Sequence, residues 1–305
     1  MDLGIWLIPL AIIGGAIRVS TPFLFVSLGE CITEKAGRIN LGHEGSLIMG
    51  AMIGYGVSLY SQSPFAGVLA AGFAGSLFGL FHGWICSKKG VNDISMGIAM
   101  MMLGTGLAFF FGKPLIKPNA PILSDFTLAP WSSIPQVQQA FKMNFLFITG
   151  SILAILLHIG FKRSRWGLIL RIAGENKESG IALGFDVDRI RIIATSAGSF
   201  FSGIAGAYLS LYYPGSWNEG LSSGQGLMAV ALVIFARWSP LRCLAASLLF
   251  GGASALGPAL QSAGYSSGYY LLNALPYILT LLIMIIGNKS SKAGSAPAEL
   301  SIVNR

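Results

Sequence analysis

Charged side chains are scarce in this chain of 305 residues. Asp, Glu, Lys and Arg make up 10% of the sequence, whereas hydrophobic residues make up 53%. A soluble domain of this size covers its surface with charge, so the composition excludes an ordinary soluble protein. The net charge of +8 would suggest nucleic-acid binding only if the distribution of the charges along the chain were ignored.

Cysteine is also rare, and the sequence motifs of common enzymes are missing. The three cysteines, Cys31, Cys86 and Cys243, lie in or beside apolar runs, so we expect buried small side chains rather than disulfides. There is no HExxH motif or His/Cys cluster for a metal, and no GxSxG motif or acid pair in a setting suited to hydrolysis. Without a GxxxxGK[ST] motif, the chain cannot bind ATP through a P-loop. The N-terminus has no basic region before its first apolar run, so no cleavable signal is expected.

Apolar runs of membrane-spanning length recur along the chain and predict an all-α, polytopic membrane protein. We expect about nine transmembrane helices, at residues 4–28, 41–60, 64–86, 94–111, 144–161, 190–213, 221–235, 241–260 and 269–286. Forty glycines fit close helix packing in lipid. Five prolines between residues 112 and 143 forbid a long helix there, and the tail from residue 287 is polar and expected to be disordered.

The basic residues predict the orientation of the chain in the membrane. Residues 162–191 hold seven of the twenty Lys and Arg side chains and form the longest polar interruption. With the N-terminus outside and the C-terminus in the cytoplasm, sixteen of the twenty lie on the cytoplasmic side, as the positive-inside rule requires. The opposite orientation would export these sixteen charges. We therefore expect a multi-pass protein of a bacterial-type plasma membrane.

A first polar hinge, at residues 40–45, interrupts the approach to the second apolar segment. The surrounding stretch, residues 29–50, is too polar for a lipid-facing helix and contains glycines that permit a break. A break exposes backbone groups that lipid does not tolerate but a lined cavity does. Asn40, His43 and Glu44 lie at this break, and we predict that they hydrogen-bond a polar solute.

A second polar hinge, at residues 220–226, resembles the first. Both put glycine and polar residues ahead of an apolar run, and the two runs cross the predicted membrane in opposite directions. Paired interrupted segments of this kind are typical of transporters with inverted-repeat-like halves, although chance also explains so short a match. Asn218, Glu219 and Gln225 are candidates for the solute pathway here, with decoration of an outer loop as the alternative for Asn218 and Glu219. Asn92 is a further candidate, with capping of the following helix as its alternative role.

The central loop contains a predicted short helix at residues 177–183. Asn176 is a suitable N-cap and Gly184 a suitable stop. Ile181 and Leu183 would then be apolar side chains on a cytoplasmic helix, suited to docking in a groove of another protein. They could equally lie against the membrane surface or the bundle.

Three stretches of this region resemble the permease subunits of ABC importers of the ribose and branched-chain amino-acid class. They are SRWGLILRIAGEN at 164–176, ALGFDV at 182–187 and IRIIATSAG at 190–198. The resemblance spans about residues 18–287. The first hinge and GLMAVALVIFARWSPL at 226–241 are most similar to the nucleoside-type branch, whereas the sugar-type branch usually has a GIDLSVGS-like first hinge. His43, in place of a branched apolar residue, and Asp93, in place of Glu, depart from the nucleoside pattern and leave the exact solute open.

The resemblance implies a transport subunit rather than an enzyme. Residues 1–288 would form the permease domain, with a coupling loop at 162–191, and residues 289–305 a polar cytoplasmic tail. Coupling to an ATPase would fall on the loop residues Gly174, Glu175, Asn176, Gly180 and Ile181. The implied partners are a second permease chain, alike or paralogous, two ATP-binding subunits and an extracytoplasmic solute-binding protein. The chain itself would bind no cofactor, and ATP and Mg would belong to the ATPase partner.

The expected function is the translocation path for a small polar solute, a nucleoside in the first place and a simple sugar as the alternative. An ion-coupled secondary transporter is a further alternative, with Glu44 or Asp93 as the ionisable group. An integral-membrane enzyme would need clustered acids or histidines at one face, which the sequence does not show.

Overall fold

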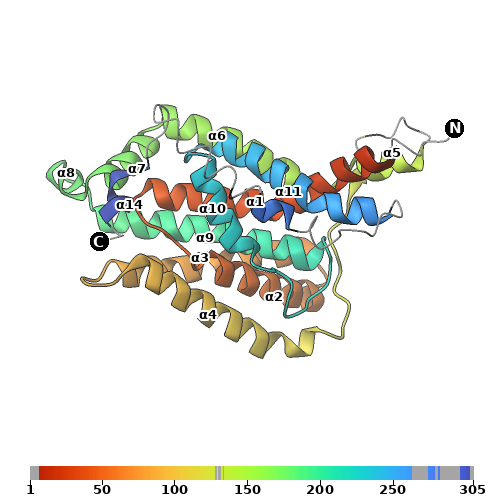
Figure 1. Cartoon of the computed structure of the whole chain (residues 1–305). Helices are drawn as coiled ribbons and strands as arrows, with labels where there is room; N and C mark the ends of the chain where they lie inside the picture. Colours follow the sequence, from red (N-terminus) through yellow and green to blue (C-terminus); the bar gives the residue numbers. More distant parts are fainter. Residues whose placement is uncertain are drawn as a thin grey trace.

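The computed structural model describes residues 7–127, 129, 132, 134–262, 274–278, 281 and 296–302. Within these residues, almost all of the regular secondary structure is helical, as the sequence predicts (Figure 1). The helices are α1 (Leu7–Lys35), α2 (His43–Ser61), α3 (Pro64–Cys86), α4 (Asp93–Gly112), α5 (Pro135–Ala140), α6 (Phe145–Arg163), α7 (Arg165–Glu175), α8 (Lys177–Ala182), α9 (Val187–Leu211), α10 (Gln225–Phe235), α11 (Pro240–Ser262) and α14 (Ala298–Ile302).

Six helices in the described residues are long and apolar enough to cross a membrane: α1, α3, α4, α6, α9 and α11. The expected segment at 41–60 corresponds to α2, which has 19 residues but does not belong to this set. The expected segment at 221–235 is shortened to α10, which has 11 residues. The expected segment at 269–286 lies outside the described residues except for 274–278 and 281.

Helix α9 lies at the centre of the bundle and packs against α1, α2 and α3 (Figure 1). Small residues permit these close approaches. A Cβ atom added to Gly206 would lie 2.0 Å from the Leu47 carbonyl oxygen of α2, and one added to Gly203 would lie 2.0 Å from the Ala71 carbonyl oxygen of α3. Helix α9 therefore connects α1, α2 and α3 along its length.

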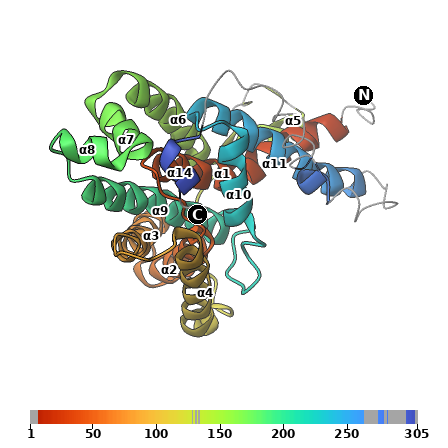
Figure 2. The same ribbon diagram turned by 60° about the vertical axis from the view of Figure 1, so that its left-hand side comes forward.

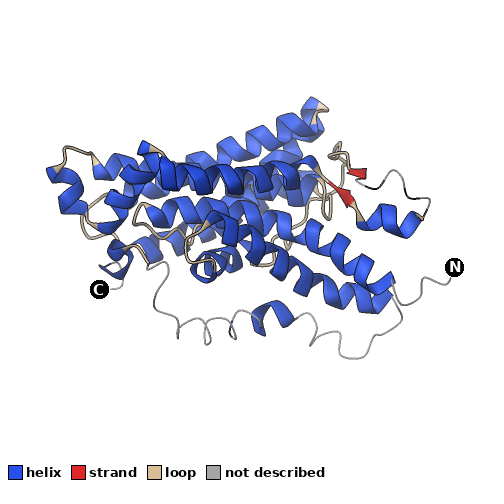
Figure 3. Ribbon diagram, turned by 90° about the horizontal axis from the view of Figure 1, so that it is seen from above, coloured by secondary structure: helices blue, strands red, loops and turns tan. Residues whose placement is uncertain are grey.

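The region between α4 and α6 contains only short elements, as its prolines predict. They are the 3-10 helix η1 (Lys113–Leu115), α5, and the antiparallel strands β1 (Phe126–Thr127) and β2 (Lys142–Met143). Figure 3 shows the two strands at one end of the bundle. Helices α7, α8 and α14 lie at the opposite end (Figure 1).

Two details differ from the expectation. The first expected segment ends at residue 28, but α1 continues through the polar residues to Lys35, because α9, α10 and α11 surround its last turns and shield them from lipid. The helical structure is interrupted after Lys35 and resumes at His43, the start of α2. Residues 296–302 of the tail, expected to be disordered, contain α14, whose Leu300 is buried.

Candidate functional site

The end of α1 carries two buried carboxyl groups, Glu30 and Glu34. An Oε atom of Glu30 accepts a hydrogen bond from the backbone N–H of Asn40 at 3.0 Å, and its other oxygen lies 2.7 Å from Nε2 of His43. Glu34 accepts a hydrogen bond from the indole N–H of Trp238, which precedes α11. The carboxyl groups of α1 therefore hold both the chain break before α2 and the turn before α11.

His43 joins three helices in the interior of the bundle. Its side chain is completely buried, with Nε2 at Glu30 of α1 and Nδ1 at 2.7 Å from the hydroxyl of Ser202 on α9. Asn40 has a comparable role, since its Oδ1 accepts the N–H of Gly42 at 3.0 Å and its Nδ2 donates to Ser199 of α9 at 3.0 Å. In this conformation both residues bind neighbouring helices through their polar atoms.

Glu44 connects the first hinge to the second. Its carboxylate accepts hydrogen bonds from the hydroxyl of Ser222 at 2.5 Å, from the N–H of Gly226 at 2.6 Å and from the N–H of Gly224 at 3.2 Å. These N–H groups belong to the start of α10, where helical N–H groups lack partners in their own helix. Glu44 of α2 therefore caps α10 across the bundle and neutralises its positive end.

Gln225 lies at the same junction, and its Oε1 is buried without a hydrogen-bond partner among the described residues. The two hinges that the sequence predicts are therefore in contact, and Asn40, His43, Glu44 and Gln225 are gathered around the adjoining N-terminal ends of α2 and α10. An acceptor with free capacity next to two helix starts suits a neutral donor such as a hydroxyl or amide group.

The other two pathway candidates have local partners. Asn92 caps α4, because its Oδ1 accepts the N–H groups of Ile94 at 2.9 Å and Ser95 at 3.1 Å. Asn218 is exposed in the loop before α10, and its Oδ1 accepts the N–H of Gly220 at 3.1 Å. Both arrangements correspond to the alternative roles considered from the sequence.

A buried ion pair supports the first hinge from the side. Nη1 of Arg38, between α1 and α2, lies 2.5 Å from Oδ1 of Asp93 at the start of α4, and both side chains are at most 10% exposed. Sequence reasoning did not single out Arg38, Glu30, Ser199, Ser202 or Ser222. For Glu30 the available signal was its spacing of four residues from Glu34, which puts both carboxyl groups on one face of a helix.

The predicted coupling residues form a second cluster, at the end of the bundle where Figure 2 shows α7 and α8 beside the start of α9. A Cβ atom on Gly174 would lie 2.3 Å from the Lys35 carbonyl oxygen of α1, and one on Gly180 would lie 2.7 Å from Val187 of α9. Asn176 caps α8 by accepting the N–H of Ser179 at 2.8 Å, as the sequence predicts. The glycines thus hold α7 and α8 tightly on the bundle.

The opposite face of this cluster is open. Ile181 is 56% exposed and Leu183 is 64% exposed, and Glu175 is exposed at the end of α7. In the described structure no bundle helix covers these two apolar side chains. The fold therefore presents a short, rigidly mounted helix with an apolar edge.

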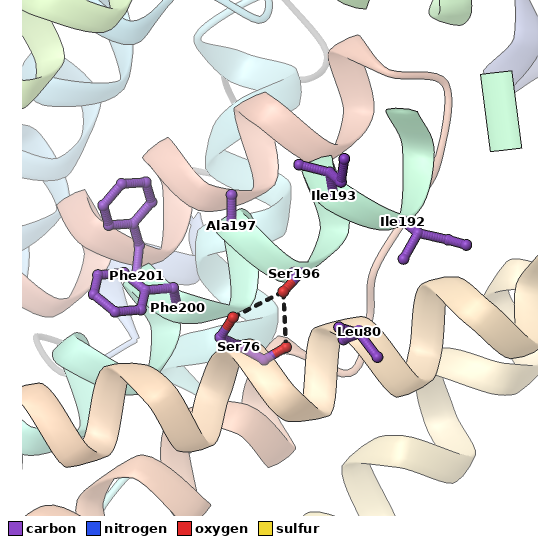
Figure 4. A pocket seen from close by; sticks show the side chains of 8 residues that line it. All are labelled: Ser76, Leu80, Ile192, Ile193, Ser196, Ala197, Phe200 and Phe201. Atoms are coloured by element: carbon purple, nitrogen blue, oxygen red, sulfur yellow. Dashed lines mark hydrogen bonds between the residues drawn. The ribbon is translucent and has the colours of Figure 1, made fainter. Parts of the chain in front are cut away.

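A separate cavity of about 300 Å³ lies between α3 and α9 (Figure 4). Its lining is mainly apolar and includes Leu80, Ile193 and Phe200. Its two serines, Ser76 and Ser196, hydrogen-bond each other with a distance of 2.8 Å between their hydroxyl oxygens. None of the predicted pathway residues lines this cavity, so it is distinct from the junction of the hinges. The described residues contain no group of three or more His, Cys, Asp and Glu side chains that could hold a metal ion.

Comparison with known proteins identifies the family. Residues 12–287 match the family described as branched-chain amino acid transport system / permease component. The chain is 32% identical over 260 residues to the putative glucose ABC transporter permease protein TsgC13 of Haloferax volcanii, an alignment that covers 82% of this chain and 78% of that protein.

Two further relatives are similar over most of their length. The chain is 30% identical over 316 residues to the guanosine ABC transporter permease protein NupQ of Bacillus subtilis, with 94% of this chain and 95% of that protein covered. It is 26% identical over 297 residues to the nucleoside ABC transporter permease protein NupC of Lactococcus lactis, with 90% and 91% covered.

These matches exclude the ion-coupled transporter and the membrane enzyme as alternatives. A permease component is a non-catalytic transport subunit that works with ATPase and binding-protein partners. The six candidate spans agree with a multi-pass membrane protein. With a family match over residues 12–287, this chain belongs to the branched-chain amino-acid-type permease components of ABC importers.

Proposed function

We propose that the chain forms the translocation path for a neutral polar solute, in the first place a nucleoside. The observation that carries this proposal is the meeting of α2 and α10 at Glu44, within the bundle. Helix α10 has 11 residues, about 16 Å, which is roughly half of the hydrocarbon thickness, so one of its ends lies inside the membrane region. Polar backbone at that depth is tolerated where it lines a path for a solute.

The charge at the junction favours a neutral solute. A free helix N-terminus attracts anions, but here the carboxylate of Glu44 already occupies the N–H groups of Gly224 and Gly226. An anionic solute would meet this carboxylate, whereas hydroxyl and amide groups can exchange hydrogen bonds with Asn40, Glu44 and Gln225. Nucleosides and simple sugars both satisfy this requirement.

The relatives support two solute classes. NupQ and NupC, named for guanosine and nucleosides, align over about nine-tenths of their lengths or more, and TsgC13, named for glucose, is 32% identical. The nucleoside-like patterns of the first hinge and of residues 226–241 favour the nucleoside, and a sugar is the second candidate. Asn92 and Asn218 belong to the proposed path only if α4 and the loop before α10 rearrange during transport.

The working assembly in this proposal contains two permease chains, alike or paralogous, two ATP-binding subunits and a solute-binding protein. ATP and Mg belong to the ATP-binding subunits. The N-terminus is outside and the tail cytoplasmic, so that α7 and α8 face the ATPase. Gly174, Glu175, Asn176, Gly180 and Ile181 form the coupling surface, and the exposed Ile181 inserts into the ATPase.

The solute is tested with the cognate binding protein and the whole assembly. A thermal-shift screen with nucleosides and sugars should give a raised Tm with nucleosides, and proteoliposomes should take up the same compound in an ATP-dependent manner. A raised Tm with sugars alone would indicate that the solute is a sugar and not a nucleoside. A raised Tm with neither class, together with no uptake of either, would refute the solute assignment.

Coupling is tested with Ile181→Asp and Gly180→Asp. Each should abolish co-purification of the ATPase and ATP-dependent uptake. Asp at position 181 would put a charge into the interface with the ATPase, where it is costly to desolvate, and Asp at position 180 would collide with Val187 and displace α8 from α9. Ile116→Asp is the matched control, since Ile116 is 49% exposed but lies beyond α4, near the opposite end of the bundle. Wild-type uptake in both coupling variants would refute the coupling assignment.

A further inference from the structure

The C-terminal segment reaches the coupling region and inserts a carboxylate into it. Residues 296–302 include α14, which packs against α7 at the end of the bundle where α8 lies (Figures 1 and 2). Leu300 is 6% exposed, and the side chain of Glu299 is 15% exposed. The segment is therefore docked on the coupling cluster, although it follows α11 by more than thirty residues in the sequence.

The carboxylate of Glu299 joins α8 to α9, in addition to the turn between them, the close approach of Gly180 to Val187 and the exposed Lys177–Asp188 ion pair. Oε1 accepts the backbone N–H of Lys177 at 2.8 Å, and Oε2 pairs with Nη2 of Arg191 at 3.0 Å. Lys177 is the first residue of α8, whose N–H has no partner within the helix. Arg191 belongs to α9, so Glu299 ties the start of α8 to the central helix.

Arg191 extends this connection to two more helices. Its guanidinium donates from Nε to the Ala36 carbonyl oxygen after α1 at 3.1 Å, and from Nη2 to the Ala173 carbonyl oxygen in α7 at 2.8 Å. The side chain is buried, and a buried guanidinium is costly unless acceptors surround it. Glu299 supplies the negative charge among these acceptors.

The connection leads directly to the first hinge. Gly37 follows Ala36 with a φ of +85°, and a Cβ atom there would lie 3.0 Å from Nη2 of Arg191 and 3.1 Å from Cβ of Glu299. The chain from Gly37 then runs through Arg38, which pairs with Asp93, to Asn40 at the hinge. Arg191 and Glu299 thus lie between the coupling helix and the residues that enter the solute path.

We propose that Glu299 is a positioning residue for coupling, which holds α7 and α8 in fixed relation to α1 and α9. It transmits displacement of α8 by the ATPase to the first hinge. The proposal rests on the proposed docking of the ATPase on α8 and adds a role for the C-terminal segment. Without the carboxylate, the start of α8 loses its direct connection to Arg191 and, through Arg191, to the start of the hinge.

The test uses the complete importer, with its ATPase and binding protein, in proteoliposomes. Glu299→Ala and Glu299→Gln are compared with the wild type by three readouts: co-purification of the ATPase, rate of ATP hydrolysis, and solute taken up per ATP. We expect unchanged co-purification and a loss of solute per ATP of about tenfold for the alanine variant. The glutamine variant keeps an acceptor for Lys177 but not the charge, so its loss should be smaller.

Asp188→Ala is the matched control. Asp188 also contacts Lys177, with Oδ1 at 2.7 Å from Nζ, but this ion pair is 37% and 39% exposed. An exposed pair contributes little, so this variant should transport within about twofold of the wild type. A purely structural role for Glu299 would lower the yield of the assembly without changing solute per ATP in the material that assembles.

The proposal would be overturned if Glu299→Ala took up as much solute per ATP as the wild type. If Glu299→Ala does not assemble, an unchanged amount of solute per ATP in Glu299→Gln would overturn it. Loss of the ATPase from either variant would also overturn it, because Glu299 would then serve assembly rather than coupling. If the ATPase binds Ile181→Asp as well as it binds the wild type, the proposed docking of the ATPase on α8 is refuted. This outcome distinguishes failure of the proposed function from failure of the inference about Glu299.

Discussion

Glu44 illustrates how one side chain can define the junction of two helices. Its carboxylate accepts three hydrogen bonds from the second hinge and has no exposed alternative, because the residue is buried. We predict that Glu44→Ala lowers the free energy of unfolding by about 1–3 kcal/mol or more, since buried donors lose their acceptor. The measurement is a denaturant titration of the purified chain in mixed micelles.

Two variants qualify this prediction. Glu44→Gln keeps one acceptor oxygen, so it should lower the free energy of unfolding by less than Glu44→Ala. Glu219→Ala is the control, because it removes the carboxylate of an exposed residue in the loop before α10. It should change the free energy of unfolding by no more than about 0.5 kcal/mol. Equal stability of Glu44→Ala and the wild type would mean that Glu44 does not cap α10 in the membrane.

The Arg38–Asp93 pair offers a second prediction at the level of residues. Removing one partner leaves a buried charge, at a cost of about 3–5 kcal/mol, whereas replacing both by neutral side chains costs less. Arg38→Met, Asp93→Asn and the double variant, compared by the same unfolding titration, should therefore show a strong favourable coupling. If the changes in unfolding free energy of the two single variants simply add in the double variant, Arg38 and Asp93 do not interact in the membrane.

The residues of the first hinge could be predicted because polar groups in an apolar segment stand out. Asn40, His43 and Glu44 belong to a polar stretch that leads directly into an apolar segment, and the structure brings all three inside the bundle. Their partners could not be predicted, since Ser202 lies 159 residues after His43 and the pairing depends on the register of α2 against α9. Serine is common in membrane helices, so Ser199 and Ser202 give no signal of their own.

At the level of helices, the sequence predicts well where apolar segments lie and less well how long they are. The expected segments at 64–86 and 144–161 nearly coincide with α3 and α6. Helix α10 starts four residues later than expected, because Ser223 and Gly224 both adopt positive φ angles that end the preceding turn. Helix α1 continues seven residues beyond expectation because other helices, rather than lipid, surround its polar end.

Close helix packing leads to a prediction for glycine. Gly206 of α9 touches α2 so closely that an added Cβ would lie 2.0 Å from the Leu47 carbonyl oxygen, which cannot move without shifting α2. Gly206→Ala should therefore destabilise the bundle by about 1–3 kcal/mol. The measurement is again the free energy of unfolding in mixed micelles.

Gly106 of α4 is the matched position. An added Cβ there has no neighbour within 4 Å in the described structure, so Gly106→Ala should leave stability unchanged or raise it by up to about 1 kcal/mol. Equal effects of the two substitutions would indicate that α2 and α9 do not pack as closely as the structure has them.

For the whole molecule, the two ends of the bundle differ in charge and in the elements they carry. The α3–α4 turn with Lys88 and Lys89, the basic α7–α8 region and α14 lie at one end, and the strands and the start of α1 lie at the other (Figures 1 and 3). The proposed orientation puts the basic end in the cytoplasm.

This orientation can be tested with single cysteines. Lys89 and Lys117 are both exposed, one in the α3–α4 turn and one after η1, and the native cysteines Cys31, Cys86 and Cys243 are buried and should react slowly. In intact spheroplasts, a membrane-impermeant maleimide should label Lys117→Cys and not Lys89→Cys, and both variants should be labelled after the membrane is opened. The reverse pattern would put α7 and α8 outside, where no cytoplasmic ATPase can reach Ile181, and would remove the basis for coupling through Glu299.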